Sequence, residues 1–224
     1  MIELNKIYNE DCLEGIKRIS DESIDAVISD PPYFLGMTHN GKKGDFSDLA
    51  ICAPFYSQLF NEFKRVLKKE SGSAYFFCDW RSYAFYYPLI SNTLGAKNLF
   101  VWDKGGGPGS VYNFEHELII FSTRKTRLHG VGSNVIKNIK GFSGGAKSTN
   151  GEKVHPTQKT VELLEKLILD STSEGDTILD CFIGSGTTAV AAMRNNRNFI
   201  GFELQEKYYN IANERIAAAI DNQL

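Results

Sequence analysis

The segment Asp180-Cys-Phe-Ile-Gly-Ser-Gly-Thr-Thr188 constrains the fold more than any other part of this sequence. It follows a short apolar run, Thr177–Asp180, that reads as a strand, and it opens a helical pattern over Gly186–Asn196. Glycines at a strand-to-helix turn let the backbone approach a ligand closely, and the first amides of the helix face polar or negative groups. The segment therefore predicts a strand–turn–helix unit of an α/β fold.

An acidic residue ends the next predicted strand, Asn198–Glu203, 17 residues after Gly186. In dinucleotide-binding folds an acid at this place accepts hydrogen bonds from ribose hydroxyls. The glycine turn and Glu203 together predict a nucleoside cofactor at the strand ends. Ala189 stands where the strict fingerprint has its third glycine. On this motif alone, an NAD-dependent oxidoreductase and a simple glycine-capped helix are both alternatives.

The rest of the chain alternates between strand-like and helix-like patterns. Strands are predicted at Ile24–Ser29, Ser73–Cys78, Asn98–Trp102 and His116–Phe121. Helices are predicted at residues 54–69, with Pro54 in the first turn, at Gln158–Asp170 and at Gln205–Ile220. Residues 122–157 are expected to be a long irregular insert, since few of them are apolar. This alternation indicates a parallel, doubly wound α/β sheet.

The composition excludes several classes of protein. No apolar run approaches the ~20 residues of a membrane span. The first residues include acids and lack an apolar core, so no signal peptide is expected and the location should be cytoplasmic. The cysteines lie far apart and the histidines show no ligand spacing, so we expect reduced, mostly buried thiols and no metal. The cysteines are Cys12, Cys52, Cys78 and Cys181.

Charge is distributed unevenly, although the net charge is only −2. Residues 124–153 contain seven basic side chains and one acid, so this segment carries +6 and the remainder carries −8. A basic segment on an acidic body suggests that one face meets a polyanion. A solvated, flexible loop is the alternative interpretation.

The turn Asp30-Pro31-Pro32-Tyr33 follows the predicted strand Ile24–Ser29. It combines a carboxylate, a rigid backbone carbonyl and an aromatic ring. The Asp30 carboxylate and a proline carbonyl could hold the two N–H groups of an exocyclic amine, because proline fixes φ and aims the carbonyl. Tyr33 could stack on a flipped-out base, an interaction of ~1–3 kcal/mol. The alternative is a Pro-Pro turn capped by an aspartate.

Three motifs of this chain resemble those of the beta class of amino-methylating DNA methyltransferases. The DPPY turn resembles their catalytic motif, and DCFIGSGTTAVAA resembles their S-adenosylmethionine motif, DxFxGSGTT. HPTQKTVELLEKLI (His155–Ile168) resembles the helix motif that precedes it, and NEDCLEGI (Asn9–Ile16) also matches. The order DPPY, basic insert, HPTQK and FxGSGT is that of the beta class, and the resemblance covers nearly the whole chain.

This resemblance implies a Rossmann-like S-adenosylmethionine-dependent methyltransferase fold, with a mixed seven-stranded sheet flanked by helices and one strand reversed. It implies a single methyltransferase domain over residues 1–224. The domain would have a catalytic region at 1–121, a short target-recognition insert at about 122–154 and a cofactor-binding region at 155–224. The implied activity is site-specific DNA methylation at the N6 amino group of a flipped-out adenine, as in restriction-modification systems.

Other activities compete with that reading. Cytosine-N4 methyltransferases are the nearest, although their motif more often begins with serine than with the aspartate found at position 30. Glutamine methyltransferases carry a similar motif after the cofactor motif, which the order here disfavours. A catalytically silent DNA-binding module is a further alternative, and the intact motifs argue against it. DPPY and HPTQK have no place in an NAD oxidoreductase.

The resemblance also assigns roles to residues. The catalytic set is Asp30, Pro31, Pro32 and Tyr33. The cofactor-binding set is Asp11, Asp30, His155, Thr157, Lys159, Asp180, Phe182, Gly184, Ser185, Gly186, Thr187, Thr188 and Glu203. Two of these have plain alternatives, a surface acid for Asp11 and a solvated lysine for Lys159.

Partners follow from the resemblance and from the basic residues. The expected DNA contacts are Lys42, Lys43, Arg124, Lys125, Arg127, Lys137, Lys140 and Lys147, most of them to phosphates. The expected partner is double-stranded DNA, and a homodimer and a companion restriction endonuclease stay open. Residues 34–48 are expected either to close over the flipped base or to form a simple disordered loop.

Overall fold

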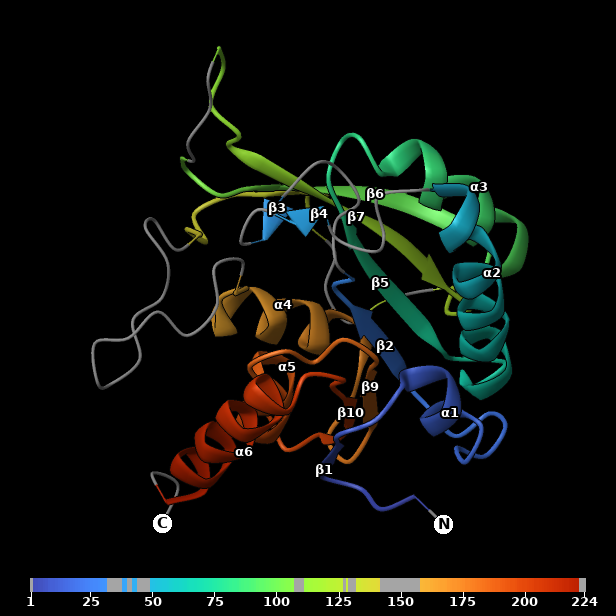
Figure 1. Cartoon of the computed structure of the whole chain (residues 1–224), viewed down its shortest axis with the longest axis vertical. Coiled ribbons are helices and arrows are strands. Elements are labelled where there is room, and N and C mark those ends of the chain that lie inside the picture. Colours follow the sequence, from blue (N-terminus) through green and yellow to red (C-terminus); the bar gives the residue numbers. More distant parts are fainter. Residues whose placement is uncertain are drawn as a thin grey trace.

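An eight-stranded sheet forms the middle layer of the computed structural model, which describes residues 2–31, 38–39, 42–43, 49–106, 111–126, 128, 132–141 and 158–221. Its strand order is β1-β10-β9-β2-β5-β7-β6-β8 (Figure 1). The strands are β1 (Lys6–Tyr8), β2 (Ala26–Ser29), β5 (Ser73–Cys78), β6 (Ala96–Asp103), β7 (His116–Thr123), β8 (Val135–Ile136), β9 (Thr177–Asp180) and β10 (Asn198–Phe202). β7 alone among them runs antiparallel to its two neighbours, β5 and β6. A separate two-stranded pair joins β3 (Thr38–His39) to β4 (Lys42–Lys43).

Helices cover both faces of the sheet. The helices α1 (Cys12–Ile16), α2 (Leu49–Val66) and α3 (Tyr83–Thr93) pack on one face, in a core that includes Phe76 and Phe202. The helices α4 (Val161–Ser171), α5 (Thr187–Arg194) and α6 (Glu206–Asp221) pack on the other, against residues such as Tyr75 and Phe199. Alternate residues of each strand point to opposite faces, so β5 supplies both cores. Burial of apolar surface on two sides fixes the register of the central strands.

The expected fold class is confirmed, with one strand more than expected. The extra strand, β8, comes from the insert that was predicted to be irregular, and it pairs in parallel with β6 through Val101 and Trp102. The elements β1, α1 and α3 were not predicted. β1 has three residues and α1 has five, too few to show a periodic pattern. α3 contains Pro88 after five apolar or aromatic residues in a row, Tyr83–Tyr87, so its sequence shows no helical alternation of polar and apolar residues.

The helix predicted at residues 54–69 begins and ends earlier than expected. α2 begins at Leu49, so Pro54 lies inside the helix, where the hydrogen bond that its missing N–H would make is lost. The helix ends at Val66 because Leu67 forms an isolated parallel bridge with Ile24. Backbone hydrogen bonds from Ile24 to Val66 and from Lys68 to Ile24 hold this bridge.

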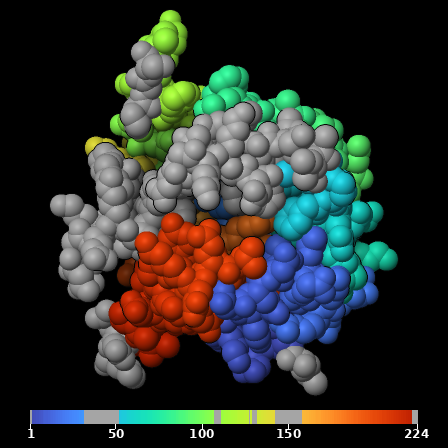
Figure 2. Space-filling model, viewed as in Figure 1, coloured from blue at the N-terminus to red at the C-terminus, as the bar shows by residue number. Residues whose placement is uncertain are grey.

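One edge of the sheet gathers the ends of the parallel strands. β1, β10, β9, β2, β5 and β6 all point to this edge, which we call the carboxyl edge, and β7 begins there. Figure 2 shows the N-terminal residues, in blue, lying against the C-terminal residues, in red. In open α/β sheets ligands bind outside the carboxyl ends of the strands. The positions that follow these strands are therefore where a site is expected.

The predicted state of the cysteines is confirmed, since Cys12, Cys52, Cys78 and Cys181 are buried and free. Within the described ranges no helix is both long and apolar enough to cross a membrane. The same residues contain no group of three or more side chains able to hold a metal ion.

Candidate active site at the carboxyl edge

Asp30 and Pro31 follow β2 directly at the carboxyl edge. The Nζ atom of Lys159, which lies just before α4, is 2.7 Å from an Asp30 carboxylate oxygen. The Lys159 side chain is 5% exposed and the Asp30 side chain 25%. Lys159 is therefore an inward-facing cation in contact with the predicted catalytic aspartate, and the solvated-lysine alternative does not hold.

A second carboxylate approaches the same lysine. Glu117, the second residue of β7, lies 3.0 Å from the Lys159 ammonium and 3.1 Å from the ammonium of Lys104, which follows β6. The four groups form an alternating row, Asp30–Lys159–Glu117–Lys104, with no net charge. The Lys159 ammonium also lies 5.1 Å from the centre of the Phe77 ring, within range of a cation–π attraction.

The row keeps Lys159 and Glu117 ionised. Burial alone would lower the pKa of Lys159, but the carboxylates of Asp30 and Glu117 outweigh it and raise that pKa above its usual value. Burial would likewise raise the pKa of Glu117, but the charges of Lys159 and Lys104 hold it at about 2. A buried ammonium is stable only when it is paired and hydrogen-bonded in this way.

The glycine turn between β9 and α5 has the backbone that its sequence predicts. Gly184 and Gly186 both have positive φ, at 52° and 81°. A Cβ at Gly184 would meet no atom closer than 3.9 Å, so space remains above the turn, whereas one at Gly186 would come within 3.0 Å of Ala212. Gly184 thus leaves room for a ligand, and Gly186 allows α6 to pack closely.

Arg215 of α6 holds this turn from behind. Its guanidinium donates to the Ser185 carbonyl oxygen at 2.5 Å, to the Ser185 hydroxyl at 2.9 Å and to the Thr187 hydroxyl at 3.2 Å. Burial lowers the pKa of Arg215, and the nearby charge of Arg194 adds to the effect. Ser185 and Thr187 are therefore both engaged within the protein.

Asp180 ends β9 and is buried beneath the turn. Its carboxylate accepts hydrogen bonds from the Phe182 amide at 2.9 Å and the Thr188 hydroxyl at 2.5 Å. Burial raises the pKa of Asp180 to about 7, and the charges of Asp30 and Glu203 add to the effect. The Phe182 ring reaches toward α2, with its centre 6.4 Å from that of Phe55. Asp180 and Thr188 therefore shape the turn from inside.

Glu203 follows β10 and bridges two loops. Its carboxylate accepts from the Gly184 amide at 3.0 Å and from the Gln205 amide at 2.8 Å. Burial raises its pKa, against the effect of these amides. The Asn9 side chain donates to the Glu203 carbonyl oxygen at 2.8 Å, which ties the end of β1 to the end of β10. Asp11 caps α1 by accepting from the Leu13 amide at 2.7 Å.

Some expected residues lie outside the described residues. Pro32, Tyr33, His155 and Thr157 do, as do Arg127 and Lys147, the loop residues 34–37 and most of 40–48. The β4 strand contains Lys42 and Lys43, whose side chains are also outside the described part.

The basic residues after β7 are not near this site. Because β7 is reversed, Arg124 and Lys125 follow it at the opposite edge of the sheet, beside the beginning of β5. The Lys125 ammonium donates to the Ser171 carbonyl oxygen at 2.7 Å, at the end of α4. These two expected DNA contacts therefore lie at the edge away from the candidate site, and their role in DNA binding stays a prediction. Lys137 and Lys140 follow β8, which runs parallel to β6, and so lie toward the carboxyl edge.

Sequence reasoning missed Glu117, Lys104, Asn9 and Arg215. Glu117 lies in a strand predicted from its apolar residues, and Lys104 precedes a run of three glycines. Arg215 has the appearance of an ordinary polar residue on the amphipathic helix α6. Only the pairing of β6 with β7 brings Glu117 beside Lys104. For Glu117, the sequence offered one sign of a role in the site: it is an acidic residue at the beginning of a predicted apolar strand.

Comparison with solved structures defines the class of fold. The chain superposes on the M1.HpyAVI–SAM complex with a TM-score of 0.71 at 24% identity, covering 94% of this chain and 98% of that one. It also superposes on the cytosine-N4-specific PvuII DNA methyltransferase with a TM-score of 0.72 at 17% identity, covering 97% and 91%. The fold, with the glycine turn and Asp30-Pro31 on one edge, is that of the Rossmann-like DNA methyltransferases.

Sequence comparison gives the family. The family model described as DNA methylase, N6_N4_Mtase, matches residues 24–214. The Type II methyltransferase M.HinfI of Haemophilus influenzae is 30% identical over 248 aligned positions, which cover 95% of this chain and 68% of that protein. The chain belongs to the N6/N4 family of DNA methylases.

Proposed function

We propose that this chain transfers a methyl group from S-adenosylmethionine to the N6 amino group of adenine in double-stranded DNA. Its residues 1–224 would act as one methyltransferase domain. The observation that carries the proposal is the position of the Asp30 carboxylate, which follows β2 on the same edge as the glycine turn and is paired with a buried lysine. A carboxylate held in this way can face an amine next to a bound cofactor.

The residues at the carboxyl edge fit the proposed cofactor. A nucleoside with a cationic sulfonium suits an edge that presents the carboxylates of Asp30 and Glu203 beside a glycine turn. Space above Gly184 admits a ligand, and the two amides on Glu203 fix the direction of its carboxylate. M1.HpyAVI, whose fold this chain shares, was solved as a complex with SAM.

The cofactor would supply an electrophilic methyl group, which passes to the amine as the carbon–sulfur bond breaks and its electron pair goes to sulfur. The Asp30 carboxylate and the Pro31 carbonyl would accept hydrogen bonds from the two amine protons. As the nitrogen gains positive charge, the Asp30 carboxylate would stabilise it, and the nitrogen would then pass one proton to that carboxylate or to solvent water. Tyr33 would stack on the base, as proposed from the sequence.

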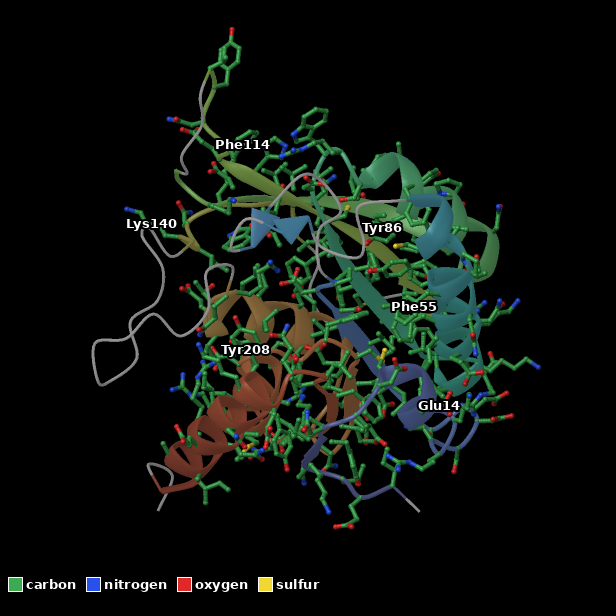
Figure 3. All side chains as sticks on the ribbon, viewed as in Figure 1. Glu14, Phe55, Tyr86, Phe114, Lys140 and Tyr208 are labelled. Carbon is green, nitrogen blue, oxygen red and sulfur yellow. The ribbon has the colours of Figure 1, made fainter. Side chains whose placement is uncertain are left out.

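Exposed aromatic side chains support a DNA surface on this edge. Trp80 follows β5, and Phe114 precedes β7 on the hairpin between β6 and β7 (Figure 3). The Arg81 guanidinium lies 5.5 Å from the Trp80 ring centre and 5.8 Å from that of Phe114. Tyr112 is 85% exposed on the same hairpin. Aromatic rings stack on bases and basic residues such as Lys137 and Lys140 contact phosphates, so this edge suits DNA.

Adenine is preferred over cytosine because the motif begins with Asp30, as the resemblance implies for adenine-N6 enzymes. Cytosine N4 is the second candidate, since PvuII DNA methyltransferase, which shares the fold, is cytosine-N4-specific. The similarity to M.HinfI, a Type II methyltransferase, favours a companion restriction endonuclease for this chain as well. We also propose a cytoplasmic location, as for other enzymes that act on cellular DNA.

The test is methyl transfer from labelled S-adenosylmethionine to unmethylated genomic DNA, followed by mass spectrometry of the nucleosides. N6-methyladenine is expected, and an Asp30→Ala variant should give none while still binding the cofactor. Detection of N4-methylcytosine would leave the proposed methyl transfer unchanged and identify cytosine as the target base. If the enzyme binds the cofactor but the DNA stays unmethylated, DNA would be excluded as the substrate.

A further inference from the structure

Glu117 and Lys104 form a charged layer behind the pair Asp30–Lys159. Glu117 uses one carboxylate oxygen for Lys159 and the other for Lys104, at 3.0 and 3.1 Å. Their side chains are 14% and 20% exposed, so water screens these contacts only partly. The proposed reaction at Asp30 makes no direct use of either residue.

The position of Lys159 between two carboxylates determines how strongly it acts on Asp30. Its ammonium has three N–H donors and divides them between Asp30 at 2.7 Å and Glu117 at 3.0 Å. In a site of low polarity each neighbouring charge acts strongly. Glu117 therefore draws part of the hydrogen bonding and part of the attraction of Lys159 away from Asp30.

We propose that Glu117 is a positioning residue: acting through Lys159, it sets the orientation of the Asp30 carboxylate and the negative charge that Asp30 offers to the target amine, and Lys104 holds Glu117 in place. This inference rests on the proposed function, because it concerns the same carboxylate. It adds two residues that the motifs of the chain do not contain.

Loss of the Glu117 charge has a defined consequence. With glutamine at this position, Lys159 directs more of its charge at Asp30. Asp30 then stabilises less well the positive charge that develops on the amine nitrogen in the transition state. Binding of cofactor and DNA, which do not depend on that developing charge, stays the same. The effect is therefore on the chemical step and leaves the ground state unchanged.

The first experiment measures single-turnover methylation with enzyme in excess over DNA and saturating S-adenosylmethionine, so that product release does not enter. Glu117→Gln is expected to slow the chemical step about tenfold. Glu117→Asp, which keeps the charge, should recover part of the rate. Glu115→Gln is the matched control, since Glu115 is an exposed glutamate two residues earlier, and it should keep the wild-type rate. Dissociation constants for cofactor and DNA should match the wild type in all three.

A second experiment is independent of activity. The titration of the Lys159 side chain is followed by NMR of its Cε and Nζ nuclei in the wild type and in Glu117→Gln. Removal of one of its two carboxylates should lower the pKa of Lys159. If Glu117→Gln fails to fold, Lys104→Met is titrated in its place, with Lys97→Met on β6 as its control. Glu117 then loses the competing charge of Lys104 and acts more strongly on Lys159, so the pKa of Lys159 should rise, and an unchanged titration would overturn the inference.

The outcomes separate this inference from the proposed function. An active wild type with an equally fast Glu117→Gln variant would overturn the inference and leave the function intact. An unchanged Lys159 titration in Glu117→Gln would overturn it whether or not the protein methylates DNA. A wild type that methylates no DNA would overturn the proposed function, while the NMR experiment would still decide whether Glu117 acts on Lys159.

Discussion

The ammonium of Lys159 lies 2.7 Å from the carboxylate of Asp30, although 129 residues separate them in the chain. This contact joins Asp30, which follows β2, to the segment that leads into α4. In the sheet, β2 also pairs with β9, the strand that follows α4, and this pairing has only two registered residue pairs. The ion pair thus adds to a short junction at the centre of the molecule.

Replacement of Lys159 by methionine should destabilise the protein and abolish methylation. The change removes the cation that lies between the carboxylates of Asp30 and Glu117, although Glu117 keeps its contact with Lys104. Loss of one partner from a buried pair costs about 3–5 kcal/mol. Urea denaturation measures this loss of unfolding free energy. Lys166→Met is the control, since Lys166 forms a more exposed pair with Asp170 on α4 and should cost at most about 1 kcal/mol. If the two variants lost equal amounts of unfolding free energy, the row Asp30–Lys159–Glu117–Lys104 would have no special role in stability.

Replacement of Glu203 by glutamine should weaken S-adenosylmethionine binding. The substitution keeps the shape of the side chain but removes a charge whose direction is fixed by the Gly184 and Gln205 amides. Loss of a hydrogen bond to a charged group costs about 1.5–3 kcal/mol, a roughly 10- to 100-fold rise in dissociation constant by calorimetry. Glu206→Gln, an exposed change in the first turn of α6, should bind as the wild type does. Unchanged affinity in Glu203→Gln would exclude Glu203 from the cofactor site.

Stability should depend on pH through Asp180. Burial raises its pKa to about 7 in the folded protein, whereas an unfolded aspartate titrates near about 4. Between these values the folded state holds a proton that the unfolded chain releases. The stabilisation from Asp180 is therefore complete below about pH 4 and is lost as pH rises to about 7. Urea denaturation at several pH values should show wild type losing stability relative to Asp180→Asn across this window. A constant difference between the two proteins would contradict the raised pKa.

The motifs of the sequence predicted the positions of Asp30, Glu203 and the glycine turn because each follows a strand with a clear apolar pattern. Strand ends in a parallel sheet meet at one edge, so a pattern local in the sequence was enough to predict that these residues lie close together. The partners of Lys159 could not be found in this way. Glu117 and Lys104 depend on which strands are neighbours, and no local pattern specifies that order.

The position of Arg124 and Lys125, at the edge away from the candidate site, could not be predicted for a similar reason. Their charge was correctly recognised, but their place depends on the direction of β7. The resemblance implied one reversed strand without telling which one. A strand that runs the other way carries the residues after it to the far edge, so the same basic segment begins away from the site and approaches it only after β8.

Trp80 and Tyr112 should contribute to DNA affinity without contributing to stability. Trp80 is 60% exposed and Tyr112 85%, so neither is needed for the core. Stacking on a base is worth about 1–3 kcal/mol, which predicts a rise in the DNA dissociation constant of roughly 5- to 150-fold for each alanine variant. Fluorescence anisotropy with a labelled duplex measures it. Leu169→Ala, an exposed apolar residue of α4, serves as the control. If both aromatic variants bound DNA as tightly as the wild type, Trp80 and Tyr112 would not be part of the DNA surface.

The strand order also sets the course of folding. β9 and β10 lie between β1, from the first ten residues, and β2, so the sheet is continuous only after residues 177–202 have entered it. During synthesis β1 has no strand to pair with until β10 has left the ribosome. Contacts between residues so distant in sequence slow folding, because loop closure must precede them. β1 must therefore wait, with its pairing edge open, for strands that are made much later.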